Sequence, residues 1–128
     1  MQTVFNLVFL CLTLTQIHGE LYAGYLSSYF KFGAVEAVYQ SISQGQDPYR
    51  WAPLHNGAAS LTSTIGSGGA RDSELVANND RTKYYLVATD LHMRKGDDWS
   101  KAETKGVSAF VMWTSTDLVN WSQPSHIQ

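Results

Sequence analysis

The sequence predicts an all-β fold made of blade-like repeats of a β-propeller. Aromatic residues make up 12% of the 128 residues and 10 residues are glycines, a composition typical of β-rich globular domains. Short alternating or apolar runs are separated by turns of Gly, Asn, Asp and Ser, and no run has the 3.6-residue period of a helix. A pattern of aromatic strands also recurs after roughly 60 to 70 residues, which is a blade-sized period.

The N-terminus carries an apolar run at residues 4–14 that is too short to span a bilayer. Polar residues and the small Gly19 follow it, which is the pattern of a secretory signal peptide over residues 1–19. We therefore expect a mature chain of residues 20–128 that is secreted and extracellular, with no further apolar stretch long enough to enter a membrane. The single cysteine, Cys11, lies within the segment expected to be removed.

Two blade-like repeats are expected, at about residues 21–54 and 70–125. In each repeat a Ser is followed by an Asp, and a Trp stands four residues after that Asp, so that Trp51 and Trp121 end the two copies. An aromatic strand and an alternating run come earlier in each copy, at 22–30 and 35–39 in the first and at 83–89 and 107–114 in the second.

The second repeat is the fuller one, because it also has an expected first strand at 71–77 and a short last strand at 120–124. Strands of a blade alternate in direction. The turn at 115–117 should therefore lie on one face, and the loops at 55–70 and 91–106 on the opposite face, which we call the loop face.

Candidate site residues gather on the loop face. Asp72 begins the first strand of the second repeat, as either a general base or a turn-capping residue, and Glu74 would share its side of the strand. Trp99, in the long loop, is either a platform on which a sugar ring stacks or a hydrophobic anchor for the loop. Asp97 and Asp98 are expected to be a solvated pair, because no further oxygen ligands of a calcium site follow at close spacing.

The charge balance argues against a nucleic-acid-binding protein, since 9 Lys and Arg stand against 11 Asp and Glu, for a net charge of −2. His55 and His92 lack the cysteine or histidine partners of a zinc site, so neither a metal nor a cofactor is expected. The glycine-rich segment at 66–69 lacks the Lys of a phosphate loop and predicts a flexible connection.

An ordered set of segments resembles glycoside hydrolase family 43, the arabinanase and xylosidase family with a five-bladed β-propeller. The segments are 25–30 (YLSSYF), 61–66 (LTSTIG), 71–72 (RD), 84–91 (YYLVATDL) and 115–121 (STDLVNW), and they lie along most of residues 20–128. The last one is shared with related propeller glycosidases, whereas the ordered set is more specific. The resemblance implies an incomplete five-bladed β-propeller, roughly the first two blade-like repeats.

The same resemblance implies hydrolysis of O-glycosidic bonds with inversion, by a general-base Asp, a second Asp that tunes pKa and a general-acid Glu. Asp72 matches the base, and the neighbouring cation Arg71 would help to keep it ionised. Arg71 and Trp99 are the candidate substrate-binding residues. Inversion requires the acid and the base to lie roughly 6.5 to 9.5 Å apart, with room for a water. The implied partner is an arabinose- or xylose-containing plant polysaccharide or oligosaccharide.

Five blades need roughly 300 residues, so the sequence is expected to be the N-terminal portion of such a protein, without the second Asp and the Glu. Whether this chain is an enzyme by itself is left open. One alternative is a non-catalytic carbohydrate-binding or degenerate propeller remnant. Another is an independent small β-sandwich of unrelated function, whose first three strands would pack face to face over the last four instead of side by side as neighbouring blades.

Overall fold

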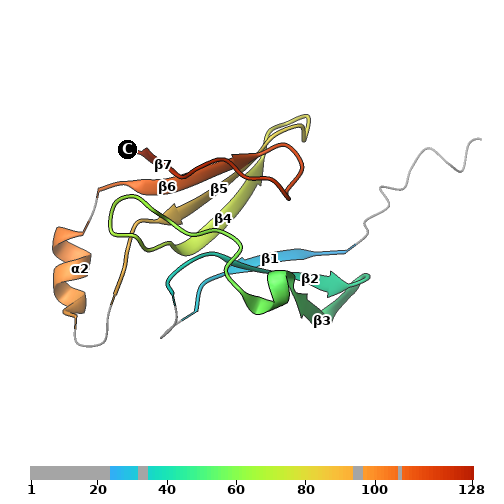
Figure 1. The fold of residues 1–128 in the computed structure, drawn as a ribbon, viewed down its shortest axis with the longest axis horizontal. Helices are drawn as coiled ribbons and strands as arrows, with labels where there is room; N and C mark the ends of the chain where they lie inside the picture. Colours follow the sequence, from blue (N-terminus) through green and yellow to red (C-terminus); the bar gives the residue numbers. More distant parts are fainter. Residues whose placement is uncertain (1–23, 32–34, 94–96, 107) are drawn as a thin grey trace, which may run out of the picture.

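The computed structural model describes residues 24–31, 35–93, 97–106 and 108–128, which form two antiparallel sheets (Figure 1). The first sheet has three strands in the order β1-β2-β3, and the second has four in the order β4-β5-β6-β7. The elements in chain order are β1 (Leu26–Tyr29), β2 (Tyr39–Gln44), β3 (Asp47–Pro53), η1 (Leu54–Gly57), β4 (Arg71–Ala77), β5 (Tyr84–Thr89), α2 (Trp99–Lys105), β6 (Phe110–Ser115) and β7 (Ser125–Ile127). The predicted all-β class is confirmed.

Each sheet is a meander in which strands that are consecutive in the chain are also neighbours in space. Gly45 lies in the turn between β2 and β3. Its φ of 64° is a left-handed conformation that glycine adopts without steric cost. Asn78 closes the turn between β4 and β5, because its side-chain oxygen accepts a hydrogen bond from the Lys83 N–H at 2.8 Å. The second sheet thus has the strand connectivity expected of a complete propeller blade.

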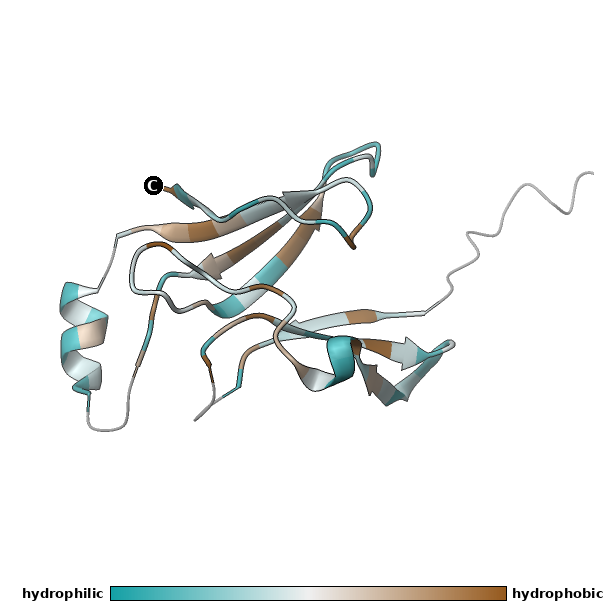
Figure 2. Ribbon diagram, in the orientation of Figure 1, coloured by the Kyte–Doolittle hydropathy of each residue, from teal (hydrophilic) through white to brown (hydrophobic). Residues whose placement is uncertain are grey.

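The hydrophobic core forms where one face of the second sheet meets the segments that flank β2 and β4. Leu86 of β5 is opposite Trp113 of β6, and Ala88 is opposite Val111, so these four side chains share one face. The buried cluster consists of Val38, Leu61, Ala70, Leu86, Ala88, Val111 and Trp113. Figure 2 shows the apolar residues of β4, β5 and β6 on the strands that supply this core.

The second strand of the first repeat begins later than the alternating pattern at 35–39 predicts. β2 starts at Tyr39, whereas Val38 makes an isolated bridge to Leu61. The carbonyl oxygen of Glu36 accepts a hydrogen bond from the Ala70 N–H at 2.8 Å. The prediction is wrong here because the backbone of these residues joins the first sheet to the segments leading into the second.

The last strand of the second repeat also lies further along the chain than the predicted 120–124. Trp121 makes only an isolated bridge to Ser115, and regular pairing with β6 resumes in β7. The intervening Pro124 has no N–H to donate to a ladder. Pro124 therefore contributes to the gap in pairing between Trp121 and β7.

Helix α2 occupies part of the predicted loop at 91–106. Asp98 caps its N-terminus, because its Oδ1 accepts a hydrogen bond from the Ser100 N–H at 3.0 Å. Two turns are too short for helical periodicity to emerge from a sequence. Among the described residues no helix is long and apolar enough to span a membrane. The predicted signal peptide at 1–19 lies outside the described residues.

Candidate active site

Asp72 lies in a β-bulge at the start of β4. The register between β4 and β5 shifts between Arg71 and Glu74, so β4 has one more residue than β5 over this stretch. Asp72 has a φ of 50°, in the left-handed region that costs a non-glycine residue ~1–2 kcal/mol. Its side chain is exposed. Strained, exposed residues of this kind concentrate at functional sites, which makes the bulge a candidate for chemistry.

The bulge also separates Glu74 from Asp72. Regular alternation predicts both side chains on one side of the strand, but the bulge interrupts the alternation between them. The Oγ of Ser73, which lies between them, is buried and has no hydrogen-bond partner among the described residues. The strand geometry therefore gives no support to Glu74 as the carboxylate that works with Asp72.

Arg71, the neighbour of Asp72, is buried and surrounded by aromatic and acidic groups. Its side chain is only 4% exposed, and its guanidinium carbon lies 4.5 Å from the ring centroid of Phe30 and 4.9 Å from that of Trp99. The Nε of Arg71 is 3.9 Å from Oε1 of Glu36. A cation so placed is attracted by the faces of both rings and by the carboxylate. Arg71 thus lies beneath the site as a support for Trp99.

Glu36 is a buried carboxylate that the sequence analysis missed. Its Oε2 accepts a hydrogen bond from the Met93 N–H at 2.6 Å, while Oε1 faces Arg71. Through its backbone oxygen it also holds Ala70, the residue before β4. One residue therefore connects the entry to β2, the start of β4 and the segment after β5. The available signal was a lone charge inside the alternating apolar run at 35–39.

Trp99 is the first residue of α2 and is 48% exposed. Arg71 lies against its ring, and the indole keeps much of its surface open to solvent. The contact between Arg71 and Trp99 also brings the start of β4 and the 91–106 segment to the same end of the second sheet. This is the juxtaposition that strand alternation predicts for Asp72 and the long loop.

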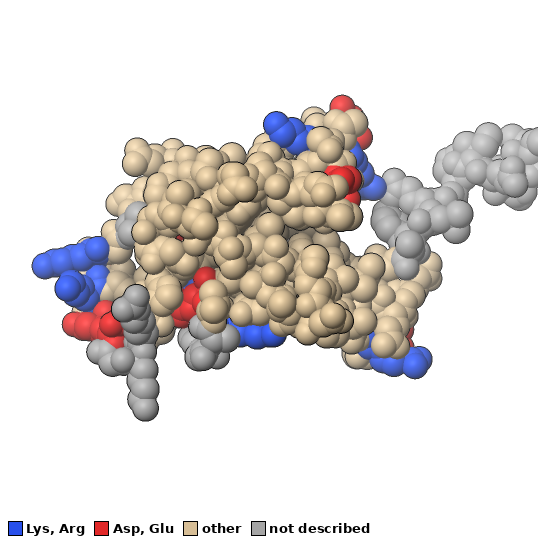
Figure 3. Space-filling model, viewed as in Figure 1, with Lys and Arg blue, Asp and Glu red and all other residues tan. Residues whose placement is uncertain are grey.

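A hollow of about 390 Å³ adjoins this segment, between α2 and the residues that follow β5. Its walls include His92, Met93, Asp97, Lys101 and Lys105. Figure 3 shows charges of both signs gathered around α2. Asp98 caps α2, and among the described residues no group of three or more His, Cys, Asp and Glu side chains is arranged to hold a metal ion. The hollow therefore offers polar and charged contacts next to helix α2.

Asp90 is a second buried carboxylate that the sequence analysis did not select. Its Oδ1 accepts hydrogen bonds from the Ser67 N–H at 2.8 Å and the Ser67 hydroxyl at 2.6 Å. Its Oδ2 lies 2.9 Å from Nε2 of His126 in β7. In a hydrolase triad the histidine lies between the serine and the carboxylate. Here the Asp90 carboxylate lies between Ser67 and His126 instead. The trio joins the 66–69 segment to β7 and has no activated serine.

The segment at 66–69, which was predicted to be a flexible connection, packs closely against Asp90 and Leu91 in the structure. Gly66 has a φ of 58°, and a Cβ placed on it would overlap the carboxylate of Asp90. A Cβ on Gly69 would run into the backbone of Leu91. Glycine is therefore needed at both positions so that this segment can lie close to the residues that follow β5.

Asp117 and Trp121 are turn and packing residues, as predicted. The Oδ1 of Asp117 accepts hydrogen bonds from the N–H groups of Asn120 at 2.7 Å and Val119 at 2.9 Å. These bonds, with the Asn120 amide, hold the pKa of the Asp117 carboxyl well below its usual range. Trp121 is half-buried and packs against the core.

Comparison with known proteins agrees with the predicted resemblance to glycoside hydrolase family 43. Residues 20–128 match a family described as a probable glycosyl hydrolase domain. The chain is also 31% identical over 88 residues to an alpha-L-arabinofuranosidase of Bifidobacterium longum subsp. longum, an alignment that covers 69% of this chain and 8% of that protein. No solved structure matches. Since the family match extends over nearly all of the chain beyond residue 19, the chain belongs to this family of glycosyl hydrolase domains, related to glycoside hydrolase family 43.

Proposed function

We propose that the chain forms part of the catalytic face of a glycoside hydrolase that cleaves arabinose- or xylose-containing plant polysaccharides with inversion. Asp72 is the general base in this proposal. The observation that carries it is the exposed, left-handed Asp72 in a bulge at the same end of the sheet as Trp99. Family membership supports a carbohydrate substrate, and the arabinofuranosidase relative supports an arabinose-containing one.

Trp99 and Arg71 act together as the proposed sugar-binding platform. The exposed indole surface stacks on the apolar face of a furanose or pyranose ring. Arg71 binds from beneath through the cation–π contact at 4.9 Å, which fixes the orientation of the indole before substrate arrives. Because Arg71 is buried, its contribution to substrate binding is through Trp99.

We further propose that the two sheets are neighbouring blades of a five-bladed propeller. The blade connectivity of the second sheet and the family membership support this architecture. The chain spans 8% of the length of the arabinofuranosidase it matches, so the activity of a whole protein is itself part of the proposal. We assign the general acid to no described residue.

Secretion after cleavage behind Gly19 also remains a proposal. Its support is that the family match begins at residue 20, immediately after the predicted cleavage site. Intact mass of the exported protein tests it, with Glu20 expected as the first residue. A product that retains residues 1–19 would contradict it.

Hydrolysis is tested by release of nitrophenol from aryl-arabinofuranoside and aryl-xyloside. Asp72→Asn is compared with the unaltered sequence in the whole protein of which this chain is proposed to form part, with Asp80→Asn in the exposed β4–β5 turn as the matched control. Loss of a general base is expected to lower the rate by 10²-fold to 10⁴-fold, while the control keeps its rate. Inversion is read from the anomeric proton signals of the first product.

A non-catalytic carbohydrate-binding protein is the second candidate, and the open, supported indole of Trp99 favours it. Arabinan or xylan in the gel would then retain the chain on affinity electrophoresis, without release of sugar. Trp99→Ala is expected to abolish the retention, whereas Asp72→Asn would leave it unchanged. Release of sugar by the whole protein but not by its Asp72→Asn variant decides for the enzyme.

A further inference from the structure

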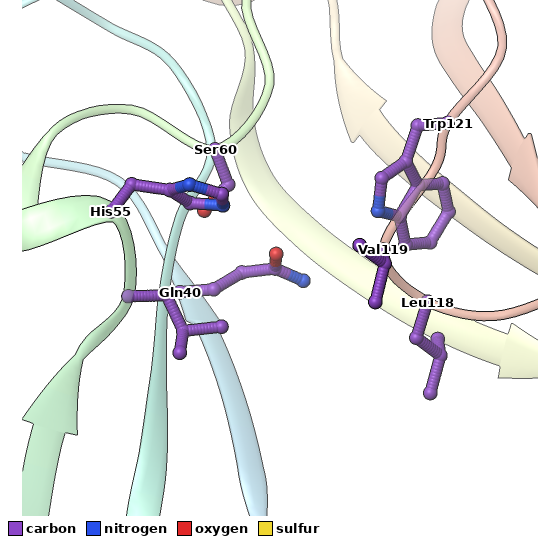
Figure 4. A pocket seen from close by; sticks show the side chains of 7 residues that line it. Gln40, His55, Ser60, Leu118, Val119 and Trp121 are labelled. Atoms are coloured by element: carbon purple, nitrogen blue, oxygen red, sulfur yellow. The ribbon is translucent and has the colours of Figure 1, made fainter.

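A pocket of about 260 Å³ lies between the two sheets, away from Asp72 (Figure 4). One wall comes from the first sheet and the segment after it, through Gln40, His55 and Ser60. The opposite wall comes from the segment between β6 and β7, through Leu118, Val119 and Trp121. Figure 4 shows the Gln40 side chain extending across the pocket toward the second wall.

The first wall offers polar groups to a ligand. The Oγ of Ser60 is buried and has no hydrogen-bond partner among the described residues. Gln40 is only 3% exposed, and its Nε2 reaches the Ser28 hydroxyl at no better than 3.4 Å. A buried hydroxyl left without a partner costs free energy, so a group that bonds it from within the pocket would be favoured.

The backbone that carries the third polar group is strained. His55 has a φ of 51° and Asn56 a φ of 54°, two consecutive left-handed residues that are not glycine. Such conformations cost ~1–3 kcal/mol each and are typical of ligand clamps and other functional sites. This strain places the His55 imidazole at the pocket beside Ser60 (Figure 4).

The second wall is apolar, since Leu118, Val119 and the indole of Trp121 form it. Among the residues that the structure describes, no Asp, Glu, Lys or Arg lines the pocket. Without Lys or Arg nothing would neutralise a phosphate or a carboxylate. The complementary ligand is neutral, with one apolar face and several hydroxyls.

We propose that this pocket binds a single neutral sugar unit. The apolar face of the ring packs on Trp121 and Val119, and its hydroxyls bond Ser60, Gln40 and His55. The site is separate from the proposed hydrolytic site, because none of its lining residues is Asp72, Arg71 or Trp99. It would hold a sugar of the polysaccharide, or a free product, at a second position on the protein.

The test is a titration of the ¹⁵N-labelled full chain with arabinose, xylose, glucose and galactose, followed through the indole N–H signal of Trp121. We expect a saturable shift with at least one sugar. Ser60→Ala removes one hydrogen-bonding group and is expected to weaken binding roughly 2-fold to 10-fold. His55→Gly does the same while allowing the left-handed backbone. His92→Ala, in the hollow beside α2, is the matched control and should bind like the unaltered chain.

Three outcomes would overturn the proposal. One is a Trp121 signal that does not move for any of the four sugars. Another is unchanged affinity in both Ser60→Ala and His55→Gly, with near-ultraviolet circular dichroism showing that they are folded. The third is an equal shift with inorganic phosphate. Because Trp99→Ala and Asp72→Asn leave this pocket intact, failure of the hydrolytic proposal would leave the titration unaffected.

Discussion

The carboxylate of Glu36 lies 3.9 Å from the Nε of Arg71, and each side chain is only 4% exposed. The two residues are far apart in the chain and meet where the first sheet joins the second. Glu36 also accepts the Met93 N–H, and Arg71 contacts the ring of Trp99. The position of the proposed sugar platform therefore depends on a buried charge pair.

Removal of Glu36 should destabilise the fold strongly. Glu36→Ala removes the carboxylate that faces the buried Arg71 cation, and breaking a buried pair by removing one partner typically costs about 3–5 kcal/mol. Urea unfolding should show this loss, and the indole emission of Trp99 should shift to the red as the ring loses its support. Glu74→Ala, on an exposed carboxylate of β4, is the control and should change the unfolding free energy by less than ~0.5 kcal/mol. Equal effects of the two substitutions would contradict a structural role for Glu36.

The left-handed backbone at position 72 should tolerate glycine better than alanine. Its φ of 50° suits glycine, so Asp72→Gly is expected to be about as stable as the unaltered chain, whereas Asp72→Ala loses ~1 kcal/mol because alanine tolerates the left-handed region poorly. Denaturant titration measures both values. If Asp72→Ala proved as stable as Asp72→Gly, the bulge would not hold a left-handed residue in solution.

Gly66 and Gly45 provide a matched pair for the close approach to Asp90. Both have left-handed φ, of 58° and 64°, but only a Cβ on Gly66 would meet other atoms within 4 Å. Gly45→Ala should cost ~1 kcal/mol through backbone strain alone. Gly66→Ala should cost clearly more, because Asp90 must move away from Ser67 and His126. Thermal melting of both variants tests this, and similar melting temperatures would show that the Asp90 contacts contribute little.

The turn at 115–121 should weaken in acid. Hydrogen bonds from Asn120 and Val119 depress the pKa of Asp117, so its ionised form is favoured in the folded state. The resulting stabilisation is fully present above the ordinary Asp pKa of ~4 and is lost as pH falls below that value toward the depressed folded pKa. Asp117→Asn should flatten this part of the pH dependence of the melting temperature between pH 5 and pH 2. A profile that is unchanged in Asp117→Asn would assign the acid sensitivity to other carboxyls.

The sequence by itself determined the features that depend on neighbours in the chain. Strand β4 lies at the predicted 71–77, and Asp117 caps the turn that its Ser-Thr-Asp motif predicts. Strand alternation also predicted that Asp72 and Trp99 lie at the same end of the sheet. These features follow from local hydrogen bonding and two-residue periodicity, which a sequence displays directly.

Only the tertiary structure decided the features that depend on distant residues. Glu36 and Asp90 gain their roles from partners 35 or more residues away, Arg71 for the one and His126 for the other. The bulge at Asp72 is defined by the pairing register with β5. Helix α2 has only two turns, which are too short to show a helical period in the sequence. The pocket at Ser60 and Trp121 exists only because the two sheets pack together. Burial and pairing of this kind are properties of the assembled fold, so no local pattern in the sequence could carry them.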